Sequence, residues 1–173
     1  RGCSVSMPFK EAVIPLVDEM EESASAIESV NTIVNDSGRL VASNTDYEAV
    51  AALIDRHALP TSASVAIRGS GGMAKAVVAA FRGAGFDNVT VIARNPDTGA
   101  ALADRYGYRF ASEDIGSGAA ILVNVTPLGM RGSDEDTLSF ASAQIDAADV
   151  VFDVVAFPAE TPLIRAGRAA GKR

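Results

Sequence analysis

The hydrophobic and polar positions change their pattern near residue 59. Before that point, they predict a strand from Cys3 to Met7 and a helix from Pro8 to Met20. After a polar passage come two strands, "SVNTIV" and "RLVASN", and "NDSG" between them has the residue types of a tight turn. A second helix should run from Thr45 or Asp46 to about Ala58, with Asn44 among the residues able to cap it.

Beyond a linker, "LPTSAS" (Leu59 to Ser64), apolar strands alternate with helices. The strands are "SVAIRG", "NVTVIAR", "YRFAS", "AAILVNVTP" and "DVVFDVVAF", and the helices are "GMAKAVVAAFRGAG", "PDTGAALADRYG" and "TPLIRAGRAAG". Such alternation is typical of a parallel sheet covered by helices on both faces. We therefore expect an α/β fold, with a Rossmann-like doubly wound parallel sheet at residues 59–173 and part of another α/β unit at residues 1–58.

Composition narrows the classes of function. The chain has 173 residues and a net charge of −7, which argues against a nucleic-acid partner because phosphate binding needs an excess of Lys and Arg. Cys3 is the only cysteine, so a metal-thiolate cluster is excluded and we expect no metal. No apolar run approaches the roughly 20 residues of a membrane helix, and we expect no membrane partner. A cytoplasmic monomer or homodimer is the expectation.

The two ends of the chain suggest a fragment. The sequence begins with Arg1 and enters a predicted strand almost at once, and it ends inside a predicted helix. We therefore expect that segments preceding and following these residues are missing.

A glycine-rich loop lies between the first strand and first helix of the second region. Its pattern is Gly69-x-Gly71-x-x-Ala74. In dinucleotide-binding folds, the first glycine allows a tight turn, the second lets the backbone approach the pyrophosphate, and the third small residue lets the helix pack on the strand. The helix N-terminus then offers N–H groups to the phosphates. The alternative is a glycine turn with a purely structural role.

The end of the next strand indicates which dinucleotide binds. NAD enzymes usually place Asp or Glu there, against the adenosine ribose. This chain has Ala93, Arg94 and Asn95 instead. A guanidinium at position 94 would attract a 2′-phosphate and could stack on adenine, so the sequence favours NADP over NAD. An ordinary surface arginine is the alternative.

Taken together, these motifs resemble those of the shikimate dehydrogenase family. The resemblance is carried by "VSMPFKEAV", "SVNTIV", "SNTDY", "GSGGMAKA", "VNVTPLGM" and "DVVAFPAETPLI", in family order and spacing over essentially the whole chain. It implies a substrate domain (1–58) followed by a Rossmann-like NADP domain (59–173). It also implies missing N-terminal and C-terminal segments, and a reversible reduction of 3-dehydroshikimate to shikimate or a related cyclic hydroxy acid.

The resemblance assigns Lys10 and Asp46 as the catalytic pair. Without it, Lys10 reads as a solvated lysine in the unfavourable first turn of a helix. A ketone that becomes an alcohol must gain a proton, and an ammonium oriented by a carboxylate is a suitable donor. The resemblance also implies that Ser6 and Asn31 bind substrate hydroxyls. His57 is expected to be a surface or capping residue.

The expected cofactor site combines the glycine loop with later strand ends. Thr126 follows a strand's carboxyl end, where cofactors lie in open α/β sheets, and it is a candidate for the nicotinamide side. Val154 lies at the family's apolar cofactor-contacting position. The full set is Gly69, Ser70, Gly71, Gly72, Met73, Arg94, Asn95, Thr126 and Val154.

Departures from the family pattern leave the substrate open. Ala156 stands where the family has a tyrosine that lies against the substrate. These departures suggest a divergent branch whose substrate is shikimate or another small hydroxy acid. Two alternatives remain: a non-catalytic NADP-binding regulatory module, and a quinate/shikimate dehydrogenase that uses NAD.

Overall fold

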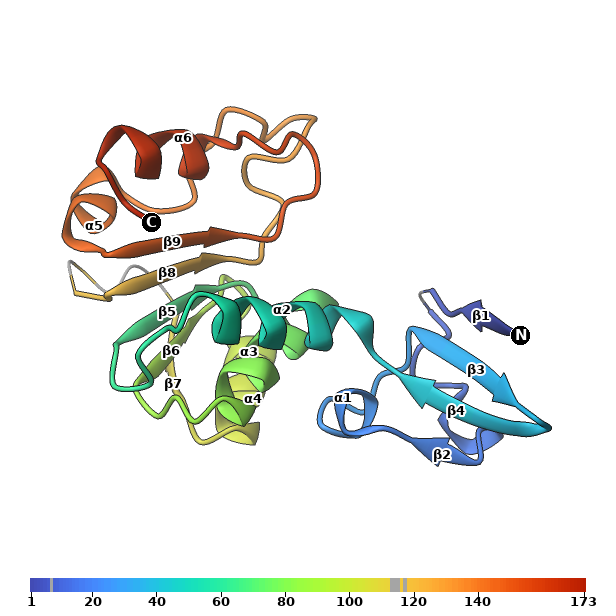
Figure 1. The fold of residues 1–173 in the computed structure, drawn as a ribbon. Helices are drawn as coiled ribbons and strands as arrows, with labels where there is room; N and C mark the ends of the chain where they lie inside the picture. Colours follow the sequence, from blue (N-terminus) through green and yellow to red (C-terminus); the bar gives the residue numbers. More distant parts are fainter. Residues whose placement is uncertain (7, 113–115, 117) are drawn as a thin grey trace. The chain divides into compact units, whose positions relative to one another are not determined.

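The computed structural model, which describes residues 1–6, 8–112, 116 and 118–173, divides the chain into two units (Figure 1). The first unit comprises Arg1–Ala58 and Lys75–Ala84, and the second comprises Leu59–Ala74 and Gly85–Arg173. Among the described residues, no helix is both long and apolar enough to cross a membrane.

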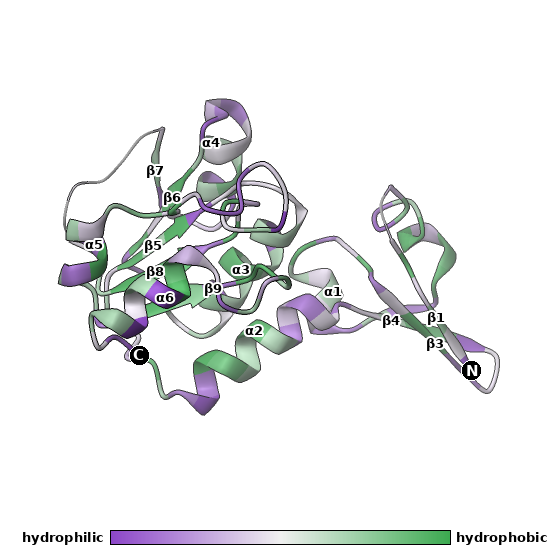
Figure 2. Ribbon diagram, turned by 90° about the horizontal axis from the view of Figure 1, so that it is seen from above, coloured by the Kyte–Doolittle hydropathy of each residue, from purple (hydrophilic) through white to green (hydrophobic). Residues whose placement is uncertain are grey.

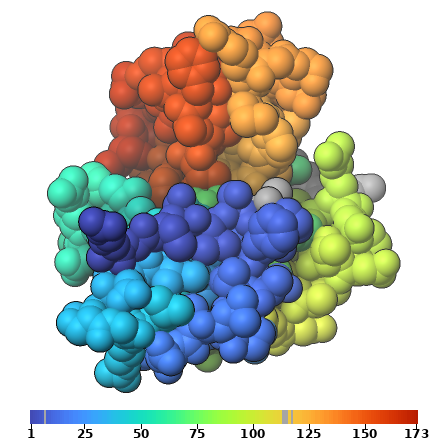
Figure 3. All heavy atoms as spheres, turned by 90° about the vertical axis from the view of Figure 1, so that its right-hand side faces the viewer, coloured from blue at the N-terminus to red at the C-terminus, as the bar shows by residue number. Residues whose placement is uncertain are grey.

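A four-stranded sheet forms the first unit. Its strands are β1 (Gly2–Ser4), β2 (Glu19–Met20), β3 (Thr32–Asp36) and β4 (Arg39–Ser43), in the order β1-β3-β4-β2. The pairs β1·β3 and β3·β4 are antiparallel, and β2·β4 is parallel. All three residues of β1 are exposed at this edge of the sheet, and the blue start of the chain lies at the surface in Figure 3.

The predicted pair of strands and the turn between them are confirmed. Asp36 pairs with Arg39, which leaves a two-residue turn. Both turn residues have positive φ, 55° at Ser37 and 100° at Gly38, as the tight turns of twisted hairpins require.

The predicted helix from Pro8 to Met20 is wrong. The described residues instead form hydrogen-bonded turns, a short 3-10 helix η1 (Ile14–Leu16) and then β2. Pro15 explains the difference, because it has no N–H to donate in an α-helical hydrogen bond. The Glu11 carbonyl accepts from Ile14 N (3.2 Å) in a tighter turn. Of the strand predicted over Cys3–Met7, only Cys3 and Ser4 belong to β1, Val5 and Ser6 are not in a strand, and Met7 lies outside the described residues.

Two helices complete the N-terminal part. The short α1 (Glu22–Ser25) lies in the polar passage, where no helix was predicted, and α2 (Thr45–Arg56) confirms the second predicted helix. Buried Ala24, Val30 and Ala42 form the core of this unit, with partly buried hydrophobic residues around them.

The second unit contains the predicted parallel sheet. Its strands are β5 (Val65–Arg68), β6 (Val89–Ile92), β7 (Arg109–Ala111), β8 (Ile121–Asn124) and β9 (Val150–Asp153), in the order β7-β6-β5-β8-β9. All neighbouring pairs are parallel. The strands β5 and β8 are almost fully buried and largely hydrophobic (Figure 2). The strand order reverses between β5 and β8, and ligands bind at the carboxyl ends of strands at such a switch point.

Helices follow the strands as the pattern predicts. The helix α3 (Gly72–Gly83) begins in the second unit, α4 (Pro96–Arg105) packs on β6 and β7, and α6 (Pro162–Ala169) packs on β9. A Cβ on Gly167 of α6 would collide with Val151, so this glycine allows a close approach of helix and strand. A further helix, α5 (Ser142–Ala147), was not predicted.

Candidate functional site

The first glycine of the loop after β5 is required by the fold itself. Gly69 has φ = 132°, and a Cβ there would lie 2.7 Å from the carbonyl oxygen of Val125. Any side chain would therefore strain the backbone and push against the segment that follows β8. This glycine brings the ends of β5 and β8 close together.

For Gly71 and Gly72, the described part of the protein shows no steric reason that would require glycine. No atom of the described residues lies within 4 Å of a Cβ built on Gly71 or Gly72, and both have ordinary φ. The small residue at the third position of the motif, Ala74, is fully buried. The loop thus leaves open space beside the backbone where a dinucleotide needs its pyrophosphate to approach.

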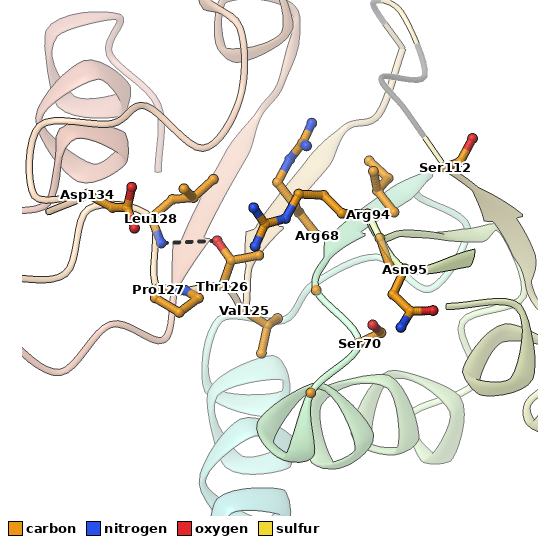
Figure 4. Close-up of a pocket in the computed structure, with 14 residues that line it drawn as sticks. Arg68, Ser70, Arg94, Asn95, Ser112, Val125, Thr126, Pro127, Leu128 and Asp134 are labelled. Carbon is orange, nitrogen blue, oxygen red and sulfur yellow. Dashed lines mark hydrogen bonds between the residues drawn. The ribbon is translucent and has the colours of Figure 1, made fainter. Parts of the chain in front are cut away.

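A pocket of about 740 Å³ opens over this loop (Figure 4). Its walls come from the carboxyl ends of β5, β6 and β8, with Ser112 after β7. Of the residues predicted to bind cofactor, six line the pocket: Gly69, Ser70, Gly71, Arg94, Asn95 and Thr126. Gly72, Met73 and Val154 are not among the residues that line it.

Arg94 is one of the charged residues that line this pocket. Its side chain is exposed and extends toward Thr126 across the pocket (Figure 4). A guanidinium in this position offers several donors to a phosphate.

Asn95 and Ser70 have structural roles as well. The side-chain oxygen of Asn95 caps α4 by accepting from Asp97 N (3.0 Å) and Thr98 N (3.3 Å). The Ser70 and Thr98 hydroxyl oxygens lie 2.8 Å apart, so the glycine loop is tied to the first turn of α4. This contact therefore fixes the loop after β5 next to the loop after β6 at the pocket.

Sequence reasoning missed several lining residues, among them Arg68 and Asp134. The guanidinium of Arg68 lies 5.1 Å from the ring centre of Phe140, a cation–π contact. A basic residue directly before Gly69 was a visible signal for Arg68. Asp134 had none, because it lies in a polar loop whose course the pattern does not predict.

The first unit brings the predicted catalytic pair together. Lys10 Nζ donates to Asp46 Oδ2 at 3.3 Å, and the side chains are 28% and 37% exposed. Both charges are thus paired and partly shielded from water, while each keeps an open side for a ligand.

Local structure explains where Asp46 and Lys10 lie. Asp46 is the second residue of α2, and the helix starts there because Asn44 Oδ1 accepts from Asp46 N (3.1 Å) and Tyr47 N (3.2 Å). The carbonyl of Lys10 accepts from Val30 N at 2.8 Å, which anchors the turn that carries the lysine.

The predicted substrate residues lie in the same unit. Asn31 Oδ1 accepts from Thr45 N (2.9 Å), so its side chain is joined to the start of α2. Its carbonyl accepts from Val5 N (2.8 Å), which places the exposed Ser6 one residue farther along the chain. The structure therefore brings Asn31 next to the segment of Asp46, and Ser6 next to the segment of Asn31.

Comparisons with known proteins point to one family. Residues 1–33 match the family model described as the shikimate dehydrogenase substrate binding domain. The chain is 55% identical over 174 residues to the shikimate dehydrogenase-like protein of Haemophilus influenzae, covering 100% of this chain and 64% of that protein. The chain thus spans less than two thirds of the length of this relative.

Two solved structures of lower identity give the same relationship. The chain is 30% identical to shikimate 5-dehydrogenase from Thermus thermophilus in complex with NADP(H) and shikimate, with a TM-score of 0.84, covering 100% of this chain and 65% of that one. It is also 30% identical to quinate dehydrogenase from Corynebacterium glutamicum in complex with NAD, with a TM-score of 0.86, covering 99% of this chain and 64% of that one.

Proposed function

Because this chain belongs to the shikimate dehydrogenase-like family, we propose that its protein is an NADP-dependent oxidoreductase. The proposed reaction interconverts 3-dehydroshikimate and shikimate, or a closely related cyclic hydroxy acid. The observation that supports it best is that one chain carries both the Lys10–Asp46 ion pair and a glycine-loop pocket with Arg94. A protein that only binds a nucleotide needs the pocket and has no use for the pair.

The pair supplies the proton transfer. NADP, when bound, supplies the hydride chemistry. In the reduction, the Lys10 ammonium donates a proton to the substrate oxygen that becomes the hydroxyl, and in the oxidation it takes that proton back. Asp46 orients the ammonium through the 3.3 Å contact. Ser6 and Asn31 are proposed to bind the other substrate hydroxyls.

The second unit fits the cofactor. The glycine loop and the start of α3 would hold the pyrophosphate, because the backbone at Gly71 is open to a ligand. Arg94 would bind the 2′-phosphate from the end of β6, where an NAD-specific site would carry an acid. We accordingly assign residues 1–58 to a substrate domain and residues 59–173 to an NADP domain.

The substrate itself is the more open part of the proposal. Ala156 is exposed just after β9, at the position where the family resemblance places a tyrosine. A methyl group leaves more room than a ring and offers no hydroxyl. We therefore propose a small cyclic hydroxy acid as the substrate class, with shikimate as the first compound to test.

Cofactor preference during turnover tests this function. With shikimate as substrate, full-length protein should show a higher kcat/KM for NADP⁺ than for NAD⁺. The variant Arg94→Ala should lower kcat/KM for NADP⁺ by about 10–100-fold, the size of a charged hydrogen bond, and leave NAD⁺ nearly unaffected. Equal use of both cofactors, or an unchanged preference in the variant, would contradict the cofactor assignment. Cofactor binding without turnover of shikimate or related hydroxy acids would contradict the enzyme assignment.

A further inference from the structure

A buried amide at the end of β8 organises one wall of the pocket without reaching the pocket itself. Asn124 is fully buried and does not line the pocket. Its Nδ2 donates to the Leu128 carbonyl (3.1 Å), and its Oδ1 accepts from the backbone N (3.1 Å) and the hydroxyl (2.7 Å) of Thr126. One side chain therefore holds both ends of the turn 125–128.

Thr126 closes the same turn from the other side. Its hydroxyl donates to Asn124 and accepts from Leu128 N at 3.2 Å, the dashed line in Figure 4. Thr126, Pro127 and Leu128 all line the pocket. The conformation of this wall thus depends on hydrogen bonds made behind it.

Asp153 extends the network to the neighbouring strand. It pairs with Asn124 across β8 and β9, and its Oδ1 accepts from Asn124 Nδ2 at 3.0 Å. Its Oδ2 accepts from the hydroxyl of Thr161 at 2.7 Å, and Thr161 in turn caps α6. Asp153 is not among the lining residues either. A buried amide has only one orientation that satisfies all these partners, so the network fixes which way Asn124 presents its oxygen.

The turn 125–128, which Asn124 holds in place, forms the wall of the pocket that faces Arg94. The guanidinium of Arg94 extends toward Thr126, and both belong to the same pocket (Figure 4). If Arg94 binds the 2′-phosphate, the adenosine attached to that phosphate lies between the two. This places the turn 125–128 on the adenosine side of the cofactor, in contrast to the nicotinamide side expected from the sequence.

We propose that Asn124 and Asp153 are positioning residues for adenosine binding, acting through the turn 125–128. This inference rests on the proposed function, because it takes the pocket as the NADP site. The role predicts that nucleotide affinity depends on the hydrogen bond between these two side chains, although neither of them lines the pocket.

The test is a titration of full-length protein with 2′,5′-ADP, which carries the adenosine half of NADP without the nicotinamide. Asn124→Asp removes both amide donors and sets a second carboxylate beside Asp153. It should raise the Kd for 2′,5′-ADP about tenfold. Adding Asp153→Asn restores a donor and an acceptor between the two positions, with their order reversed, but not the bond to the Leu128 carbonyl, so it should recover only part of the affinity.

A matched control separates positioning from general destabilisation. Tyr108→Phe removes a buried hydrogen bond to the Phe86 carbonyl, away from the pocket, and should lower the thermal midpoint without changing the Kd. Where Asn124→Asp does not fold, Asp153→Ala, which removes the acceptor for Asn124 Nδ2, should raise the Kd severalfold.

Failure of the positioning role and failure of the proposed NADP site give different results in this titration. A Kd for 2′,5′-ADP that stays within about twofold of wild type in Asn124→Asp, or in Asp153→Ala where that variant replaces it, overturns the positioning role. So does a loss of NADP⁺ affinity with 2′,5′-ADP affinity intact, which would return the turn to the nicotinamide side. Wild-type protein that binds 2′,5′-ADP no more tightly than 5′-AMP contradicts the NADP site itself, and the inference with it.

Discussion

At the residue scale, Asp153 shows how burial and hydrogen bonding act against each other on one carboxyl. Burial raises the pKa of Asp153 above its ordinary value of 3.8, and the hydrogen bonds from Thr161, Val155 and Asn124 partly offset the rise. The folded state therefore holds this proton more tightly than the unfolded state does. Between the ordinary and the raised pKa, the contribution of Asp153 to stability falls as pH rises.

This sign can be measured with Asp153→Asn, which does not titrate. The free energy of unfolding of wild type minus that of the variant should decrease as pH rises above about 4, and level off once the folded carboxyl is ionised. Urea unfolding in a series of buffers from pH about 4 to about 7 measures the difference. A difference that grows with pH would mean that hydrogen bonding outweighs burial at this site.

Single residues also mark what the sequence can and cannot predict about the site. Lys10 and Asp46 were paired by family resemblance, and the contact between them is present at 3.3 Å. Arg94 and the glycines are visible because strand and helix signals flank them. Asn124 escaped notice, since a lone asparagine at a strand end carries no pattern and its importance lies in partners on other elements.

At the element scale, the start of α2 couples stability to the site. Asn44 is 1% exposed, caps α2 and also donates its Nδ2 to the Ser29 carbonyl at 2.9 Å. Asn95 is exposed and caps α4, and among the described residues its side chain makes no corresponding hydrogen bond to a distant segment. The two caps therefore differ mainly in burial and in one additional hydrogen bond.

Asn44→Ala should lower the free energy of unfolding by about 2 kcal/mol or more, because it removes the cap and leaves a carbonyl with one donor fewer. Asn95→Ala, the matched exposed cap, should cost about 1 kcal/mol. Urea unfolding of both variants beside wild type gives the comparison. An equal or larger loss in Asn95→Ala would show that burial of the cap adds nothing.

Local signals predicted some elements and misled on others. The hairpin was predictable because Asn35–Gly38 has turn chemistry, and the strands of the parallel sheet because they are continuous apolar runs. The segment 8–20 has a helical spacing of apolar residues, yet Pro15 breaks the hydrogen-bond ladder. The six-residue α5 is too short for a clear period, and Gln144, which accepts from Ala141 N, replaces the usual cap.

At the scale of the whole chain, the proposed chemistry is divided between the two units. The Lys10–Asp46 pair belongs to the first unit, and every residue that lines the glycine-loop pocket belongs to the second. Strand order β7-β6-β5-β8-β9 was not readable from periodicity alone, because alternation of strands and helices predicts parallel pairing and leaves the order open. Right-handed crossovers limit the possible orders, and the pocket lies where this order reverses.

The division of chemistry leads to the most direct measurement, the rate of NADPH formation from NADP⁺ and shikimate by full-length protein. Lys10→Ala and Asp46→Asn should each lower kcat by about 10²–10⁴-fold. The kcat of the double variant should be little lower than that of the less active single variant, because the two residues act as a unit. The Kd for NADP⁺, measured by titration, should stay unchanged in all three. Turnover that survives both substitutions would contradict the account, and so would a loss of turnover that merely follows a loss of NADP⁺ affinity.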